Sequence, residues 1–73
     1  MYSYQNINGN SNVEAYAIGS DYIEVKFCNT SKLYRYSYAS AGRDNVETMK
    51  QLAQQGYGLN SFIMRNVRYN YEK

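Results

Sequence analysis

Hydrophobic and polar residues alternate along the first half of the chain, which is the pattern of half-buried β-strands. The pattern covers residues 13–18, 22–28 and 33–38. Polar residues at 19–21 and 29–31 separate these segments and are of turn length. Because consecutive strands joined by short turns pair side by side, the sequence predicts a three-stranded antiparallel meander.

The third predicted strand carries a tyrosine at every second position, so three tyrosines share one face: Tyr34, Tyr36 and Tyr38. Two interpretations are open. The stripe is either part of the core beneath the helices, or a platform on which the bases of single-stranded RNA stack. We favour the core, because inward aromatic residues at a period of two are ordinary sheet packing.

The hydrophobic period changes to that of a helix between Gly42 and Gly56, where apolar residues recur at helical spacing: Val46, Met49, Leu52 and Ala53. Asp44 is expected to cap the start of this helix, with Glu47 three residues later in the position of a capping box. Gly56 stands where a left-handed C-terminal cap belongs.

A second, shorter helix is expected to begin at Asn60, a residue type that caps helix starts. Leu59 and Met64 have the spacing of a hydrophobic staple. The buried stripe of this helix would consist of Phe62, Ile63 and Val67. The predicted fold class is therefore α+β, with a three-stranded antiparallel meander followed by two C-terminal helices packed on one face of the sheet.

The chain divides into three parts. Residues 1–12 are rich in Asn, Ser and Gly and are expected to be a flexible lead-in, and residues 13–67 form a single domain. Residues 68–73 are a polar and aromatic tail, for which frayed helix, edge strand and disorder all remain open. The N-terminus lacks the basic and apolar regions of a signal peptide, so we expect a cytoplasmic protein.

Composition excludes most catalytic chemistry. Among its 73 residues the chain has ten tyrosines, one cysteine and no histidine. There is no imidazole base and no histidine metal ligand, and one cysteine cannot form a thiolate zinc site. The single thiol, Cys28, is expected to pack as an inert residue. We expect no enzyme activity, no catalytic residues, no metal and no cofactor.

A family resemblance follows from two short motifs. Tyr34 and Tyr36 form a Tyr-x-Tyr in mid-sequence, and Gly56, Asn60 and Ile63 follow after the helix. In these residues the chain resembles the KTSC domain, a small bacterial domain that also occurs at the C-terminus of some lysyl-tRNA synthetases. The resemblance covers residues 13 to 67. The chain departs from the family pattern in lacking the Val-Pro that often follows the Tyr-x-Tyr.

The resemblance implies an interaction module, and its synthetase context makes RNA the first partner to consider. The net charge of +2 adds slight support for a nucleic-acid partner. The candidate nucleic-acid contacts are Lys26, Arg35, Tyr36, Arg65 and Arg68. The alternative is a protein partner or self-association without nucleic-acid binding; no membrane or small-molecule partner is expected. The tyrosines expected as surface contacts are Tyr22, Tyr57, Tyr69 and Tyr71.

Overall fold

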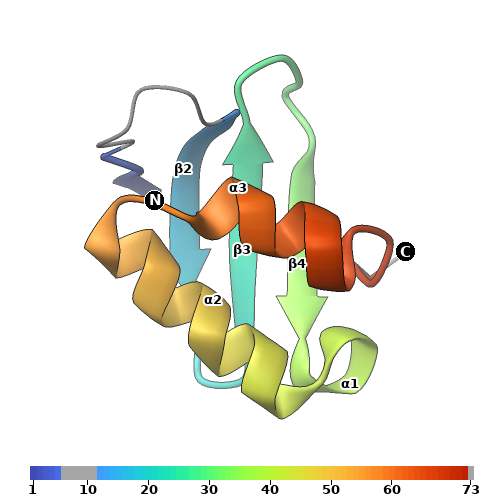
Figure 1. Cartoon of the computed structure of the whole chain (residues 1–73). Coiled ribbons are helices and arrows are strands. Elements are labelled where there is room, and N and C mark those ends of the chain that lie inside the picture. Colours follow the sequence, from blue (N-terminus) through green and yellow to red (C-terminus); the bar gives the residue numbers. More distant parts are fainter. Residues whose placement is uncertain (6–11, 73) are drawn as a thin grey trace.

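Four strands pair in chain order in one antiparallel sheet (Figure 1). They are β1 (Tyr2–Ser3), β2 (Val13–Ile18), β3 (Tyr22–Phe27) and β4 (Leu33–Ser37). The computed structural model describes residues 1–5 and 12–72. The three predicted strands are present, so the α+β class with an antiparallel sheet is confirmed. The predicted count of three is wrong, because β1 adds a fourth strand beside β2.

The longer helical segments lie together across one face of this sheet, and a short helix stands at the end of β4 (Figure 1). The helical elements are α1 (Tyr38–Ala41), α2 (Arg43–Gln55), α3 (Leu59–Phe62) and the π-helical turn η1 (Ile63–Val67), which continues directly from α3. The two predicted helical regions correspond to α2 and to α3 with η1. The short helix α1 was not predicted.

The residues at the end of β4 explain why α1 forms there. Ser37 is its N-cap and forms a reciprocal capping box with Ser40: each backbone N–H donates to the other residue's hydroxyl, at 3.0 and 3.1 Å. This box satisfies amide groups that would otherwise lack partners at the helix start. The strand therefore ends at Ser37, and Tyr38 belongs to α1 rather than to the predicted strand.

The predicted cap at Asp44 is wrong. Gly42 is the N-cap of α2, with φ 95° and ψ 141°, and no side chain caps this end. A residue with a Cβ rarely adopts these angles, which are favoured by glycine. Asp44 lies in the first turn, where its charge is favourable near the positive end of the helix dipole. At the other end Gly56 is left-handed, with φ 91° and ψ 10°, as predicted.

The predicted start of the second helix is also shifted. Its N-cap is Gly58, at φ 87°, and the helix begins at Leu59 rather than after Asn60. The predicted staple is wrong, because Leu59 is fully buried whereas Met64 is 42% exposed. Residues five apart in a helix point about 140° apart, so the two side chains lie on different faces.

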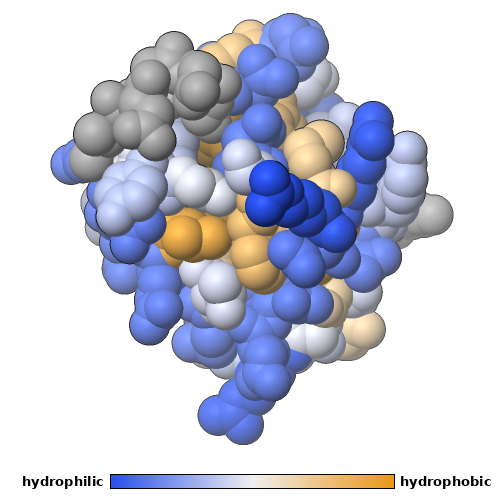
Figure 2. Space-filling view, viewed as in Figure 1, coloured by the Kyte–Doolittle hydropathy of each residue, from blue (hydrophilic) through white to orange (hydrophobic). Residues whose placement is uncertain are grey.

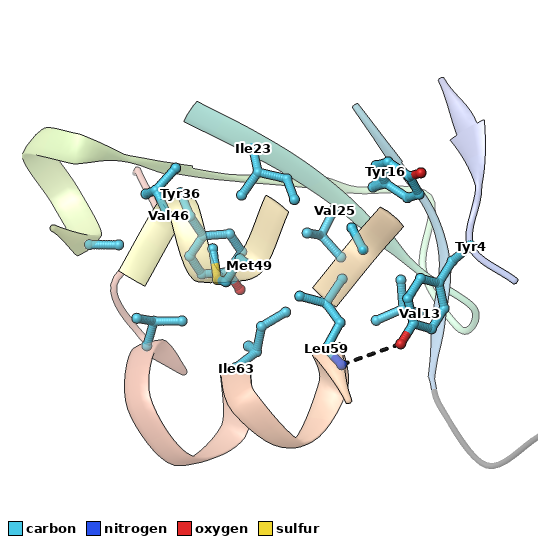
Figure 3. Close-up of a cluster of buried hydrophobic side chains, with 13 residues drawn as sticks. Tyr4, Val13, Tyr16, Ile23, Val25, Tyr36, Val46, Met49, Leu59 and Ile63 are labelled. Carbon is cyan, nitrogen blue, oxygen red and sulfur yellow. Dashed lines mark hydrogen bonds between the residues drawn. The ribbon is translucent and has the colours of Figure 1, made fainter. Parts of the chain in front are cut away.

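The core lies between the inner face of the sheet and the helices (Figure 3). Its largest fully buried side chains come from β2, β3, β4, α2, α3 and η1: Val13, Ile23, Val25, Tyr36, Val46, Met49, Leu59, Ile63 and Val67. On the helical side of the molecule, hydrophobic residues show only as separate patches among hydrophilic ones (Figure 2). No helix in the described part of the chain is both long enough and apolar enough to cross a membrane.

The first residues of the chain belong to this fold. Tyr4 is 6% exposed, and its backbone N–H donates to the Glu14 carbonyl at 3.0 Å. Its hydroxyl accepts a hydrogen bond from the Leu59 N–H at 3.3 Å, at the start of α3 (Figure 3). The described part of the predicted lead-in is thus tied to both layers, while residues 6–11 of that segment lie outside the described residues.

Candidate functional site

The predicted tyrosine stripe is divided by the structure. Tyr36 is 1% exposed and belongs to the hydrophobic core cluster, as the core interpretation predicts (Figure 3). Tyr34 is half-buried and only packs against the edge of the core. Tyr38 leaves the stripe, because it starts α1 and its hydroxyl donates to Glu47.

Two residues of this stripe, Tyr34 and Tyr36, border an open groove of about 410 Å³. We call it the tyrosine groove. It lies between the end of β3, the β3–β4 turn, β4, η1 and the C-terminal tail, and its lining consists of Phe27, Asn29, Thr30, Tyr34, Tyr36, Met64, Arg68, Tyr69 and Tyr71. Five of these nine residues are aromatic, and none of the lining residues in the described part of the chain is acidic.

Four of the five aromatic rings of the groove, those of Phe27, Tyr34, Tyr36 and Tyr71, contact one another edge to face. The ring centroids of Phe27 and Tyr34 are 5.5 Å apart, at 71°. Tyr71 meets Tyr34 at 4.8 Å and 80°, and Tyr36 at 6.2 Å and 82°. These are favoured arrangements of aromatic pairs. The tail is also held by the Glu72 N–H, which donates to the Arg35 carbonyl at 2.7 Å. The groove is therefore formed before any ligand binds.

Arg68 lines the tyrosine groove, and a second cation, Lys32, lies over two of its rings without lining it. The Lys32 ammonium is 5.2 Å from the Tyr34 ring centroid and 5.8 Å from that of Tyr71. The Arg68 guanidinium is 5.3 Å from the Tyr69 centroid. Neither cation forms an ion pair with any residue that the structure describes. Their charges are therefore free to attract an anion.

Tyr36 is the most deeply buried residue of the groove lining. Its hydroxyl has no hydrogen-bond partner among the described residues, yet no fully buried side-chain oxygen or nitrogen there lacks a partner. The Tyr36 hydroxyl therefore keeps some accessible surface.

Burial raises the pKa of Tyr36 to about 12, with smaller contributions from Tyr34 and Tyr71. Loss of the proton would place a charge in a site that water barely reaches. At neutral pH the hydroxyl is protonated and can donate a hydrogen bond.

This shift predicts a loss of stability in alkali. Because the pKa of Tyr36 is higher in the folded state than its usual value near 10, its contribution is complete below pH 10 and is lost as the pH rises towards 12. A pKa difference of this size corresponds to about 2 to 3 kcal/mol in the free energy of unfolding. Urea unfolding between about pH 9 and about pH 12 should show a shallower decline for Tyr36→Phe than for the wild type. An equal loss of stability in the wild type and in Tyr36→Phe would contradict a raised pKa for Tyr36.

Two of the predicted contacts, Lys26 and Arg35, lie on the outer face of the sheet, away from the helices. Successive side chains of a strand point to opposite faces, so these two residues point away from the face that carries Ile23 and Tyr36. Each is paired with an acid. The Lys26 ammonium is 3.0 Å from Glu14, and the Arg35 guanidinium is 2.9 Å from Glu24.

The guanidinium of Arg35 also lies 4.4 Å from the Tyr22 ring centroid. Its hydrogen bond with Glu24 raises its pKa further. The cations of the outer face are thus neutralised locally.

The predicted contacts therefore separate into groups. Tyr36 and Arg68 meet in the tyrosine groove, whereas Arg65 is exposed on η1 and does not line it. Lys32 was missed as a contact, although it directly precedes the tyrosine strand. The expected surface contacts Tyr69 and Tyr71 both line the groove.

The remaining motif residues have structural positions. Gly56 is the C-cap of α2, Asn60 is partly buried in α3, and Ile63 is fully buried in the core. The expected packing of Cys28 is wrong, because this thiol is exposed in the turn after β3. Within residues 1–5 and 12–72, no three Cys, Asp or Glu side chains gather as a metal site would require.

The tyrosine groove thus brings together aromatic rings, the unpaired cation of Arg68 and, over two of the rings, the ammonium of Lys32. Comparisons of the chain with protein-family models, with curated proteins and with solved structures found no match.

Proposed function

We propose that this protein is a small, non-catalytic binding module of the KTSC type that holds single-stranded RNA in the tyrosine groove. One observation carries the proposal: five aromatic residues and two unpaired cations gather there, with no acidic side chain among the described lining residues. Single-stranded nucleic acids are bound by such a combination, since bases stack on aromatic rings while cations attract the phosphates. A cytoplasmic location is part of this proposal.

The outer face of the sheet is a weaker candidate for the same role. To reach a phosphate, Lys26 would have to leave Glu14 and Arg35 would have to leave Glu24. The freed carboxylates would then repel the phosphates. In the tyrosine groove, by contrast, Lys32 and Arg68 need give up only their positions over neighbouring rings.

The proposal predicts modest and salt-dependent affinity. If Lys32 and Arg68 each neutralise one phosphate, the logarithm of the binding constant should fall against the logarithm of salt concentration with a slope of about −1.4. Fluorescence anisotropy with a labelled single-stranded RNA at several salt concentrations measures this slope. The double variant Lys32→Ala/Arg68→Ala should weaken binding by at least about tenfold.

A matched control comes from the outer face. Lys26→Ala/Arg35→Ala removes the same net charge but leaves the groove intact, so its affinity should stay within about twofold of the wild type. A wild type that does not bind RNA would refute the proposed function. Equal losses in the two double variants would show that overall charge, rather than the tyrosine groove, determines binding.

A protein partner or self-association is the alternative that the outer face favours. In the described part of the chain no helix covers this face (Figure 1). Leu33, which pairs with Lys26 there, is 46% exposed. Apolar residues on an open face beside an edge strand are a feature of protein interfaces. A stable dimer by light scattering, together with no RNA binding, would favour this alternative.

A further inference from the structure

We infer that the tyrosine groove holds one nucleotide at a time, with its base against the rings, its phosphate at Arg68 and Lys32, and the Tyr36 hydroxyl donating a hydrogen bond to the edge of the base. This inference rests on the proposed function and names the unit of RNA that the groove selects.

The first support is the unpartnered hydroxyl of Tyr36. The Tyr36 hydroxyl has no partner among the described residues and keeps some accessible surface, and Tyr36 lines the groove. A hydroxyl in this position is available to donate a hydrogen bond to a ligand. Since its pKa is about 12, it stays a donor at neutral pH. A ligand in the groove that carries a hydrogen-bond acceptor could accept a hydrogen bond from the Tyr36 hydroxyl.

The second support is the arrangement of the rings. Tyr71 stands nearly perpendicular to both Tyr34 and Tyr36, at 80° and 82°. A flat group that stacks on one ring therefore meets another ring at its side, so the walls enclose one base rather than a continuous stack. A volume of about 410 Å³ is at the small end of the usual range for small-ligand sites. Paired bases of a duplex cannot enter, because their edges are already occupied.

The third support is the position of the charges. Arg68 comes from the C-terminal side of the groove and Lys32 from the β3–β4 connection. A nucleotide has its phosphate one ribose away from its base, so a base at the floor places the phosphate towards these rims. An uncharged aromatic ligand would use the rings but leave both cations without a role.

Mononucleotides test the inference directly. We expect uridine, cytidine, adenosine or guanosine monophosphate to displace labelled single-stranded RNA from the wild type, as measured by anisotropy. Ribose 5-phosphate, which lacks a base, should not displace it at the same concentration. Tyr36→Phe should weaken mononucleotide binding by about 3- to 10-fold, the effect of one lost neutral hydrogen bond.

Tyr38→Phe is the matched control, because the Tyr38 hydroxyl bonds to Glu47 outside the groove. It should bind mononucleotides as the wild type does, and circular dichroism should show both variants folded. Ribose 5-phosphate that competes equally well, or Tyr36→Phe with unchanged affinity, would overturn the inference. If RNA binds but no mononucleotide competes, this inference fails while the proposed function stands; if RNA does not bind, both fail.

Discussion

Tyr4→Ala is expected to lower the free energy of unfolding by about 3 to 5 kcal/mol, the cost of removing a large buried aromatic side chain. Tyr4 is 6% exposed and packs in the core, although it is only the fourth residue of the chain. Domains of this size are stable by only about 5 to 15 kcal/mol. Urea unfolding followed by circular dichroism should therefore show a large decrease in the midpoint.

Two further variants separate the contributions of the Tyr4 ring and hydroxyl. Tyr4→Phe keeps the ring but leaves the Leu59 N–H without its acceptor, which should cost about 1 to 3 kcal/mol. Tyr2→Ala, two residues away and 69% exposed, should change stability by less than about 0.5 kcal/mol. If Tyr4→Ala and Tyr2→Ala behaved alike, the N-terminal segment would not be part of the fold.

Met49→Ala is expected to cost about 2 to 5 kcal/mol, because it leaves a cavity between α2 and the sheet. Met49 is fully buried among residues from both layers (Figure 3). A chain this short has few other contacts to compensate for that loss. Thermal and urea unfolding should both report the decrease.

The chain supplies a matched control for this change. Met64→Ala removes the same atoms from a side chain that is 42% exposed, so it should cost well under about 1 kcal/mol. The difference between the two variants measures burial alone. Similar costs for both would mean that the helix layer does not pack on the sheet as described.

The strands and main helices were predictable because their signals are local. Alternation over 13–18, 22–28 and 33–38 and helical spacing between Gly42 and Gly56 both follow from which face each residue buries. Two elements lacked such a signal. A strand of two residues is too short to show alternation, and α1 depends on the reciprocal bonds of Ser37 with a serine three residues later, in place of the usual Glu or Gln.

The tyrosine groove could be predicted only in part. Tyr36 and Arg68 were proposed as contacts from their residue types, and both line it. That Tyr71 packs on Tyr34 depends on how the tail returns to β4, a long-range contact without a sequence pattern. Lys26 is neutralised on the outer face by Glu14 of the neighbouring strand. This pairing depends on the register of β2 and β3, which the sequence pattern does not reveal.

RNA bound in the tyrosine groove should change the amide chemical shifts of the residues around it. NMR spectra recorded during titration with a short single-stranded RNA measure these changes. We expect the largest changes in the β3–β4 turn, in β4 and in residues 68–72. Shifts concentrated at Glu14, Glu24 and Lys26 on the outer face, or no shifts at a saturating RNA concentration, would contradict RNA binding in the tyrosine groove.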